Sequence, residues 1–426
     1  MSDSLYMGID LGTSGCRGMV IDAEGQVIAE ARAKLKAPLR DGAAVEQDPD
    51  LWWQVTEKVI TRLASKIDDV DDLAAIAVDG TSGTLLVTDE SGKPLTPGLM
   101  YNDARAVEQS LHIDTVAPAE TAARGASSTL AKLLWLQDHG LPVNARHALH
   151  QADWIANRLC GRYGLSDVNN SLKLGFDAVA QAWPGWLDEL GVQRHLLPQV
   201  LQPGDEMGTL NTEMAKRLGL PEGVRVRAGT TDSTAAILSS GAIEVGEAIT
   251  SLGSTLVAKV IGERPIYNAE YGVYSQPLGN HWLVGGASNT GGAVLLDYFS
   301  EEEIDELSGQ LQPEQPTGLD YYPLSSPGER FPVNDPELEP RLDPRPRNDA
   351  LFLQGMLEGM SGIEKRAYDL LTELGAPYPQ RDYSLGGGAS NPAWTQMREE
   401  RLGVKVKRAK QVQAAYGTVR LVAGLV

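Results

Sequence analysis

Two short turns rich in Gly, Ser and Thr, far apart in the sequence, constrain the fold of this chain most strongly. Residues 8–15 read Gly-Ile-Asp-Leu-Gly-Thr-Ser-Gly, and residues 251–256 read Ser-Leu-Gly-Ser-Thr-Leu. Each turn joins two apolar segments with the character of strands. Such a bend directs backbone N–H groups and small hydroxyls into one concavity, where an anion can bind. Two of them predict a nucleotide triphosphate held between two lobes, and therefore an enzyme.

The segments around the two turns follow a similar order. In the first half, strands are predicted over 5–11, 15–21, 26–33 and 73–78, with a helix over 49–67. In the second half, strands are predicted over 224–228, 247–252, 255–261, 271–275 and 281–285, with helices near 350–375 and 392–402. A strand–turn–strand meander followed by a helix, present twice, indicates an internally duplicated α/β fold. A mostly helical section is expected over 103–195 and a surface excursion over 312–349.

Length, charge and cysteine content exclude several classes of function. A chain of 426 residues is too long for one ordinary core, so two domains are expected. The formal net charge of −20 provides no electrostatic basis for binding nucleic acid or anionic lipid. No apolar run reaches membrane-spanning length, and Cys16 and Cys160 form neither a zinc motif nor a disulfide framework. We expect a cytoplasmic monomer or homodimer that binds a small molecule, and neither nucleic acid nor membrane.

The sequence contains neither of two well-known phosphate-binding patterns. A Walker A loop is absent because Gly92-Lys93 is followed by Pro94, and the glycine spacing of residues 8–15 is not that of a dinucleotide fingerprint. Instead the turn places Asp10 close to Thr13 and Ser14. A carboxylate at the end of a strand beside hydroxyls predicts a cradle for Mg²⁺ and phosphate, with an ordinary structural turn as the alternative.

Two further segments offer groups for phosphoryl transfer. Asp232 follows a predicted strand at the entrance of a helix, where it is either a helix cap or the base that the attacking hydroxyl requires. Gly386-Gly387-Gly388 lets the backbone approach a nucleotide closely. Asn391 and Trp394 offer a polar contact and a stacking face to that nucleotide, or else form a helix start with a packed tryptophan.

Taken in order, these motifs resemble the FGGY carbohydrate kinases, a family within the actin and sugar-kinase ATPase superfamily. The resemblance extends over essentially the whole chain. It rests on residues 8–14, 46–49 with Trp52-Trp53, 101–105, 127–135, 229–232, 251–255 and 386–391. Each segment alone is a weak signal, whereas the complete set in this order is specific.

The resemblance implies a two-domain ribonuclease-H-like α/β fold with internal duplication and a cleft between the lobes. Residues 1–239 are expected to form the N-terminal domain, which binds the sugar and contains the first phosphate turn. Residues 240–410 are expected to form the nucleotide-binding domain, and a C-terminal helix over 411–426 is expected to pack on the first domain.

The resemblance also implies roles for individual residues. Asp232 would be the general base, and Asp10 would act in catalysis as the Mg²⁺ ligand. ATP would be bound by Gly12, Thr13, Ser14, Gly253, Ser254, Thr255, Gly292, Gly387, Gly388, Asn391 and Trp394. The sugar would be bound by Asp79, Thr81, Ser82, Asp103 and Asp232.

The substrate prediction depends on residues 79–84, which read Asp-Gly-Thr-Ser-Gly-Thr. Xylulokinases usually carry a Gln-Met-His-Gly-like loop here, whereas Asp-x-Thr is closer to ribulokinases. The short chain further resembles a group of ribulokinase-like kinases of cyanobacteria and plants. The expected reaction is therefore ATP-dependent phosphorylation of D-ribulose to D-ribulose 5-phosphate. The alternatives are D-xylulose, another sugar or polyol, an ATPase acting with a protein partner, and a regulator without catalysis that binds sugar or nucleotide.

Overall fold

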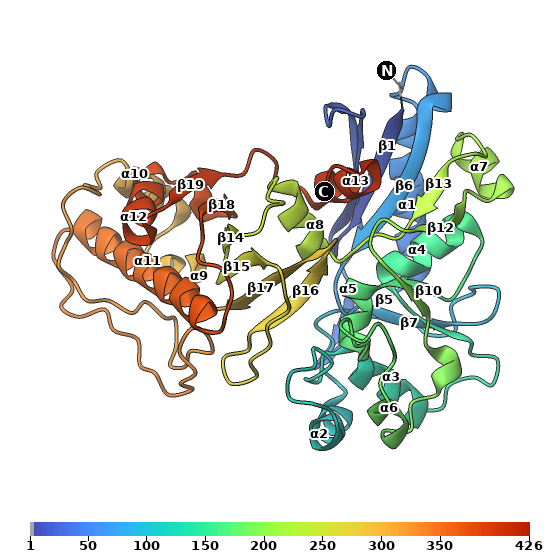
Figure 1. Cartoon of the computed structure of the whole chain (residues 1–426), viewed down its shortest axis with the longest axis horizontal. Helices are drawn as coiled ribbons and strands as arrows, with labels where there is room; N and C mark the ends of the chain where they lie inside the picture. The colour runs from blue at the N-terminus through green and yellow to red at the C-terminus, as the bar shows by residue number, and fades with distance from the viewer. Residues whose placement is uncertain (1–3) are drawn as a thin grey trace. The chain divides into compact units, whose positions relative to one another are not determined.

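The computed structural model describes residues 4–426, and the chain divides into two compact units. Unit 1 contains the residues up to Ser239 together with Gln413–Val426, and unit 2 contains Ser240–Val412. A mixed sheet with helices packed against it forms the centre of each unit (Figure 1). Among residues 4–426, no helix is both long enough and apolar enough to cross a membrane.

The central sheet of unit 1 brings the first turn next to two parallel strands. Its strands, in spatial order, are β12 (Glu206–Thr209), β13 (Arg225–Arg227), β6 (Leu73–Gly80), β1 (Leu5–Leu11), β2 (Gly15–Ile21) and β3 (Val27–Lys34). β1 and β2 pair antiparallel around the first turn, whereas β1, β6 and β13 run parallel. The carboxyl ends of these three strands therefore meet at one edge of the sheet.

The central sheet of unit 2 repeats this arrangement around the second turn. Its strands, in spatial order, are β16 (Tyr274–Leu278), β17 (His281–Ala287), β15 (Leu256–Gly262), β14 (Glu247–Leu252), β18 (Arg381–Leu385) and β19 (Lys405–Arg408). β14 and β15 pair antiparallel around the turn, and β14, β18 and β19 run parallel. The shared order confirms the predicted internal duplication of an α/β fold.

Helix α1 (Pro49–Ala64) begins where the sequence predicts a start. The Asp48 side chain accepts a hydrogen bond from the N–H of Asp50, and Pro49 occupies the first turn. The Trp52 indole N–H donates to Gln47 Oε1 at 2.6 Å, and the ring is fully buried. The segment 46–53 that contributed to the family resemblance therefore anchors α1 in unit 1.

The last helix, α13 (Ala414–Ala423), packs on unit 1 between β1 and α8 (Asp232–Ser239). Both contacts require glycine because the backbones approach closely. A Cβ atom on Gly8 would lie 2.4 Å from Ala415 O, and one on Gly417 would lie 1.7 Å from Ala235 O. The two ends of the chain thus complete one core.

The section over 103–195 is less helical than predicted. Helices α2 (Val107–Val116), α3 (Thr129–Asp138) and α4 (Gln151–Cys160) form there, but β9 (His147–His150) and β10 (Leu165–Asp167) interrupt them. β9 pairs with β7 (Leu85–Thr88), in a second sheet of unit 1. A short apolar run suits a buried strand or a helix equally well, and pairing with β7 decides the outcome.

The shorter elements of unit 1 connect these parts. They are β4 (Leu39–Asp41), β5 (Ala44–Gln47), η1 (Val70–Asp72), β8 (Gly98–Leu99), α5 (Val168–Ser171), η2 (Leu172–Leu174), α6 (Trp186–Glu189), η3 (Arg194–Leu196), β11 (Gln199–Leu201) and α7 (Thr212–Leu218).

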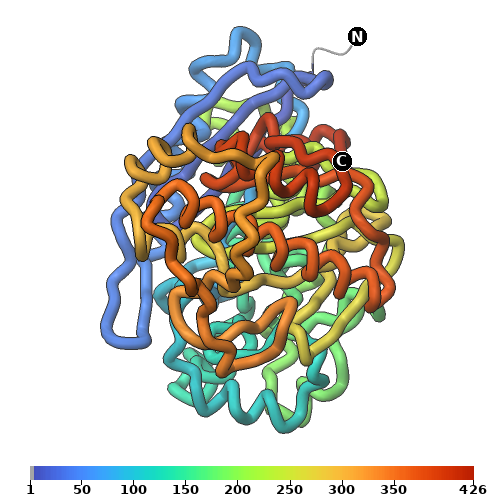
Figure 2. The backbone as a smooth tube through the Cα atoms, turned by 90° about the vertical axis from the view of Figure 1, so that its left-hand side faces the viewer, coloured from blue at the N-terminus to red at the C-terminus, as the bar shows by residue number. Residues whose placement is uncertain are grey.

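In unit 2, α9 (Gly292–Leu296), α10 (Glu301–Ser308), α11 (Asp349–Glu373), η4 (Gly387–Ser390) and α12 (Pro392–Leu402) accompany the sheet. The predicted excursion runs between α10 and α11 without a regular element among its described residues (Figure 2). It is not only a surface segment, because Phe331 is buried in the core and Glu329 accepts a hydrogen bond from Ser288. Apolar anchors spaced irregularly in a polar segment give no periodic signal.

Candidate functional site

Three carboxylates lie at the carboxyl ends of the parallel strands of unit 1. Asp10 is next to last in β1, and Asp79 is its direct neighbour in β6. Asp232 follows β13, and a parallel bridge between Gly80 and Thr231 extends the pairing of this loop with β6. Ligands of open α/β sheets bind at such an edge.

Asp10 and Asp79 form a buried acidic pair. Burial raises the pKa of Asp10, although Arg17, whose Nη1 lies 3.3 Å from Asp10 Oδ2, opposes the shift. Burial, and then the negative charge of Asp10, raise the pKa of Asp79 well above its ordinary value. The Thr418 hydroxyl of α13 donates to Asp79 Oδ2, and a side-chain hydrogen bond between Asp79 and Asp10 joins the pair.

Asp232 is partly exposed at the first residue of α8. Its carboxylate accepts hydrogen bonds from the backbone N–H groups of Ser233, at 2.7 Å, and Ser82. Burial raises its pKa to about 6, against the effect of these two donors. A Cβ atom on Gly229 would lie 1.8 Å from Val78 O, so the loop that leads to Asp232 is pressed directly on β6.

The first turn is short and open to solvent. The Gly12 N–H donates to Gly15 O at 3.0 Å, closing the bend between β1 and β2. Thr13 is partly exposed and Ser14 is exposed. The turn therefore leaves two hydroxyl-bearing residues open to solvent within four positions of Asp10 in the sequence, and the phosphate cradle stays a prediction.

The residues predicted to contact the sugar differ in exposure. Thr81 is buried, and its hydroxyl pairs with Thr84 and Gln151. Asp103 is fully buried, and its oxygens accept from the Val45 N–H and the Arg105 guanidinium. Both side chains are held by protein partners in unit 1, and their contact with the sugar stays a prediction. Ser82 is partly exposed and lies beside Asp232.

Three loops predicted to bind nucleotide converge in unit 2. The Gly292 N–H donates to Gly253 O at 2.8 Å, and the Ala293 N–H donates to Ser254 O at 3.2 Å. A Cβ atom on Gly386 would lie 2.5 Å from Leu252 O, so the triglycine loop rests on the second turn. Ser254 and Gly387 are exposed, and Thr255 and Gly388 are partly exposed.

Asn391 caps α12 and remains partly exposed, whereas Trp394 is packed in the core. Asn391 Oδ1 accepts from the Trp394 N–H at the start of α12, and its Nδ2 donates to Ser308 Oγ at 2.8 Å. The Trp394 ring is 2% exposed, and its indole N–H donates to Ser361. The ring lies under Gly388, whose Cβ atom would be 2.4 Å from it, so Trp394 supports the loop from below and has no open stacking face.

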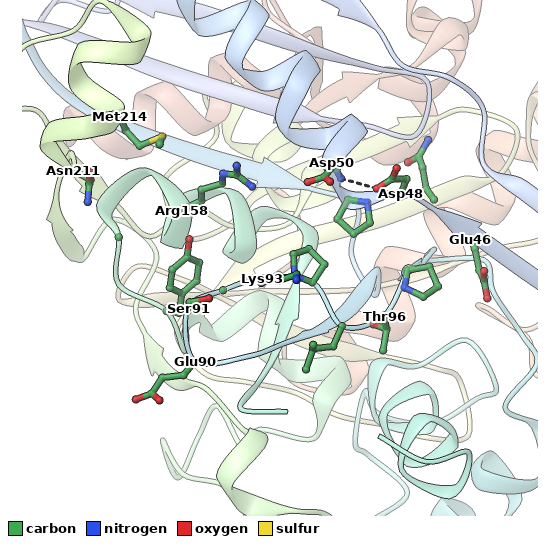
Figure 3. A pocket seen from close by; sticks show the side chains of 18 of the residues that line it. Glu46, Asp48, Asp50, Glu90, Ser91, Lys93, Thr96, Arg158, Asn211 and Met214 are labelled. Atoms are coloured by element: carbon green, nitrogen blue, oxygen red, sulfur yellow. Dashed lines mark hydrogen bonds between the residues drawn. The ribbon is translucent and has the colours of Figure 1, made fainter. Parts of the chain in front are cut away.

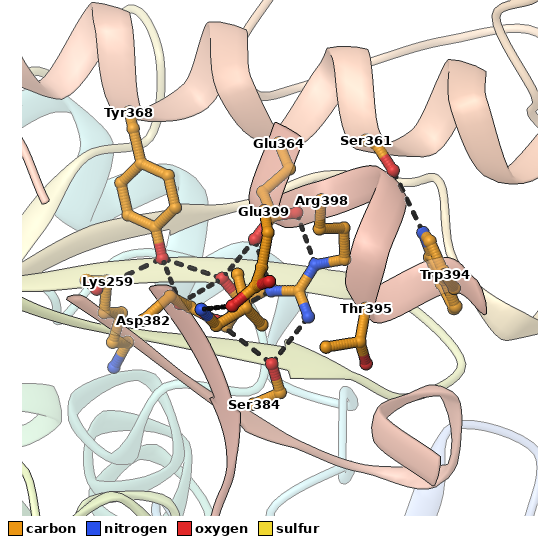
Figure 4. A network of polar contacts seen from close by, with 12 residues as sticks. Lys259, Ser361, Glu364, Tyr368, Asp382, Ser384, Trp394, Thr395, Arg398 and Glu399 are labelled. Atoms are coloured by element: carbon orange, nitrogen blue, oxygen red, sulfur yellow. Dashed lines mark hydrogen bonds and ion pairs between the residues drawn. The ribbon is translucent and has the colours of Figure 1, made fainter. Parts of the chain in front are cut away.

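A buried polar network holds the strands that lead into these loops (Figure 4). The Arg398 guanidinium of α12 donates to Glu364 of α11, to Asp382 and to Ser384 of β18. The Thr250 hydroxyl of β14 lies 2.6 Å from Glu364 Oε1 and 2.8 Å from Asp382 Oδ1, and it can donate its one proton to either carboxylate. The network thereby ties the second turn, after β14, to the triglycine loop, after β18.

Four residues of unit 1 that the sequence analysis did not single out lie around the predicted site: Arg17, Lys132, Lys173 and Thr418. Lys132 Nζ donates to Gly83 O at 2.7 Å and to Met100 O at 2.6 Å, and burial lowers its pKa to about 7. Lys173 Nζ lies 3.4 Å from Ser82 O. Lys132 falls in the segment 127–135 used for the resemblance, which is a signal for it. Arg17 faces Asp10 across the hairpin of β1 and β2, whereas Lys173 and Thr418 are brought in by long-range contacts.

A cavity of about 1030 Å³ opens elsewhere in unit 1, between residues 46–50 and 90–97 (Figure 3). Its lining includes Asp48, Arg158 and Asn211, and none of the predicted site residues within 4–426. The described residues also contain no group of three or more His, Cys, Asp and Glu side chains arranged to hold a metal ion. Metal binding by Asp10 therefore requires oxygen ligands from a bound molecule or water.

Two family matches cover most of the chain. Residues 5–239 match the N-terminal domain of the FGGY family of carbohydrate kinases, and residues 248–423 match its C-terminal domain. The xylulose kinase of Escherichia coli is 26% identical over 437 residues, covering 98% of this chain and 89% of the relative. The xylulose kinase of Lactococcus lactis is 28% identical over 422 residues, covering 92% and 82%.

Solved structures share the fold. The crystal structure of a xyloylose kinase from Brucella ovis has a TM-score of 0.88 at 24% identity, covering 99% of this chain and 91% of that chain. Plasmodium falciparum glycerol kinase with ADP has a TM-score of 0.85 at 17% identity, covering 99% and 89%. The two-unit α/β architecture is thus that of known sugar kinases. With both family domains matched in order, the protein belongs to the FGGY family of carbohydrate kinases.

Proposed function

We propose that the protein transfers the γ-phosphoryl group of ATP to a hydroxyl of a ketopentose. The observation that carries this proposal is the position of Asp232 beside Asp10 and Asp79, at the edge where three parallel strands end in a carbohydrate-kinase fold. Phosphoryl transfer needs a base for the attacking hydroxyl and groups that hold the phosphates. Unit 1 contains candidates for both.

Asp232 is proposed as the general base. The sugar hydroxyl oxygen forms the new bond to the γ-phosphorus, the bond to the ADP oxygen breaks, and the hydroxyl proton passes to the Asp232 carboxylate. A pKa of about 6 leaves this carboxylate ionised at neutral pH while keeping it more basic than an ordinary aspartate. Its backbone donors hold it at the start of α8.

The two turns are proposed to hold the phosphates. Residues 12–14 and 253–255 are exposed or partly exposed, and their residue types offer backbone N–H groups and hydroxyls that suit phosphate oxygens. Gly292, Gly387, Gly388 and Asn391 are proposed near the rest of the nucleotide. Plasmodium falciparum glycerol kinase with ADP supports nucleotide use by this fold. Trp394 is omitted because its ring is packed.

Asp10 fits Mg²⁺ in the company of phosphate oxygens. Its carboxylate oxygens are hard donors at the end of β1. The neighbouring Asp79, whose pKa is raised well above its ordinary value, favours the neutral carboxyl and leaves Asp10 as the proposed ligand. The ion, when bound, would neutralise charge on the phosphates. Asp10 would hold the ion next to the first turn. The two cysteines are free and buried, which fits the reducing cytoplasm expected from the sequence.

D-xylulose is the first candidate for the substrate, and D-ribulose is the second. The relatives named xylulose kinases support D-xylulose, so the alternative weighed from the sequence has better support than its first choice. The loop over 79–84, which lacks the Gln-Met-His-Gly-like pattern, favours D-ribulose. The choice rests on hydrogen bonds to a few hydroxyls, and such contacts can discriminate strongly.

A substrate panel tests the proposal. ADP release with Mg-ATP is measured for D-xylulose, D-ribulose, L-xylulose, L-ribulose and glycerol. We expect the wild type to turn over a ketopentose. Asp232→Asn should lose about 10²–10⁴-fold in kcat. ATP should still raise the Tm of this variant, because the nucleotide is still bound. Asp188→Asn, at an exposed site, is the control.

Three outcomes of this panel would contradict the proposal. ATP hydrolysis that does not depend on sugar would indicate an ATPase acting with a protein partner. Ligand-induced stabilisation without any turnover would indicate a non-catalytic regulator. Unchanged turnover in Asp232→Asn would remove the base assignment.

A further inference from the structure

Lys173 lies beside the proposed base on an element that the family motifs do not include. It belongs to η2 (Leu172–Leu174), which follows α5 in unit 1. Its Nζ is 3.4 Å from Ser82 O, and a Cβ atom on Gly83 would lie 3.4 Å from its Cδ. The aliphatic stem therefore lies along the loop over 79–84, and the ammonium reaches the Ser82 peptide.

The Ser82 peptide connects Lys173 with Asp232. The Ser82 N–H donates to the Asp232 carboxylate, and the Ser82 carbonyl faces the Lys173 ammonium. The positive charge of Lys173 lowers the pKa of Asp232, which places the two charges within electrostatic reach. The base and the ammonium thus border the same partly exposed residue of the loop.

The ammonium is poorly satisfied by the protein. It carries three N–H donors, and the contact to Ser82 O lies at the long end of hydrogen-bond distances. Within residues 4–426, the ion pairs recorded at 4.0 Å or less place no carboxylate on Lys173. A half-buried ammonium is costly without further acceptors, so its remaining donors require oxygen atoms from outside the protein.

We propose that Lys173 is a substrate-binding residue whose ammonium donates to an oxygen of the ketopentose close to the hydroxyl that Asp232 deprotonates. Hydroxyl and ketone oxygens both accept such a bond, and one made by a charged donor is stronger than a neutral one. This inference rests on the proposed function and adds a sugar contact that the family motifs do not supply.

Kinetics of Lys173→Met test the assignment. We expect KM for the ketopentose to rise about tenfold or more, as for the loss of a hydrogen bond from a charged group, while KM for ATP stays within about twofold. Lys173→Arg, which keeps the charge, should recover part of the loss. Lys216→Met, at an exposed lysine of α7, should match the wild type.

Binding measured without turnover separates this inference from the proposed function. Ketopentose alone should raise the Tm of the wild type, and it should raise the Tm of Lys173→Met by less. Turnover by the wild type in the same assay upholds the proposed function, so an unchanged sugar KM in Lys173→Met overturns the Lys173 assignment alone. A fall in kcat with unchanged sugar KM also overturns it, because the ammonium would then act on the transferred group. If the KM values for ketopentose and ATP rise equally in Lys173→Met and its Tm falls, Lys173 only stabilises the loop over 79–84, and the assignment is overturned.

Discussion

At the scale of single residues, Asp232 is placed so that its protonation state depends on charged groups from several elements. Asp10 on β1 raises its pKa, and Lys173 on η2 lowers it. Asp79 on β6 is electrostatically coupled to it as well. Burial is the largest influence, and the resulting pKa of about 6 lies between those of an ordinary aspartate and neutral pH.

The pH dependence of kcat/KM follows from this value. A general base works only when ionised, so kcat/KM for the ketopentose should be constant near neutral pH and fall as the pH decreases through about 6. Rates measured across the acidic range check this, with ATP-induced stabilisation at each pH as the control for folding. A profile that falls only near the pKa of an unperturbed aspartate would contradict the burial of Asp232 in the working enzyme.

At the scale of elements, the network around Arg398 joins α11, α12, β14 and β18 in the core of unit 2. Glu364, Asp382 and Arg398 are each at most 1% exposed, so every charge depends on its partners. Such a network contributes little net stability compared with apolar packing, but removing one member leaves charges unpaired. The network instead positions the second turn next to the triglycine loop.

Replacement of Arg398 by Met should therefore destabilise the protein strongly. Two buried carboxylates would lose their cation, at a cost of about 3–5 kcal/mol in the free energy of unfolding. Chemical denaturation measures the change. Arg401→Met, at an exposed arginine of the same helix, should stay within about 0.5 kcal/mol of the wild type. Equal stability of the two variants would show that the network does not hold these elements.

At the scale of the whole molecule, unit 1 is built from both ends of the chain. The helix α13 supplies Val419, fully buried, and Thr418, whose hydroxyl reaches Asp79. It packs on β1, β6 and α8, the elements that position the three carboxylates. Folding of unit 1 therefore depends on residues that come after all of unit 2 in the sequence.

This dependence predicts a large effect of a charge in α13. Val419→Asp would bury an unpaired carboxylate against β1 and should lower the free energy of unfolding by about 3 kcal/mol or more. Val426→Asp, at a residue that is 41% exposed, should change it by no more than about 0.5 kcal/mol. Calorimetry or denaturant titration measures both. Similar stabilities would mean that α13 is dispensable for unit 1.

Local sequence patterns were enough to predict the α/β class, its duplication and the position of most strands. These follow from local patterns, because apolar runs, turn residues and helix caps act within a few positions. The ordered motifs were also sufficient to indicate the carbohydrate-kinase family, which the matches over 5–239 and 248–423 confirm. Asp10 stood out at the end of a predicted strand and Asp232 after one, each next to a turn.

Long-range packing, by contrast, sets which side chains are buried against protein partners and which remain open to solvent. Asp103, Thr81 and Trp394 have the residue types of ligand contacts, yet folding buries them against partners distant in the sequence. Asp79 meets Thr418 across 339 positions of sequence, and Lys173 meets Ser82 across 91. Such pairs depend on how sheets and helices pack, and burial and charge environment arise only from that packing, so no local pattern encodes them.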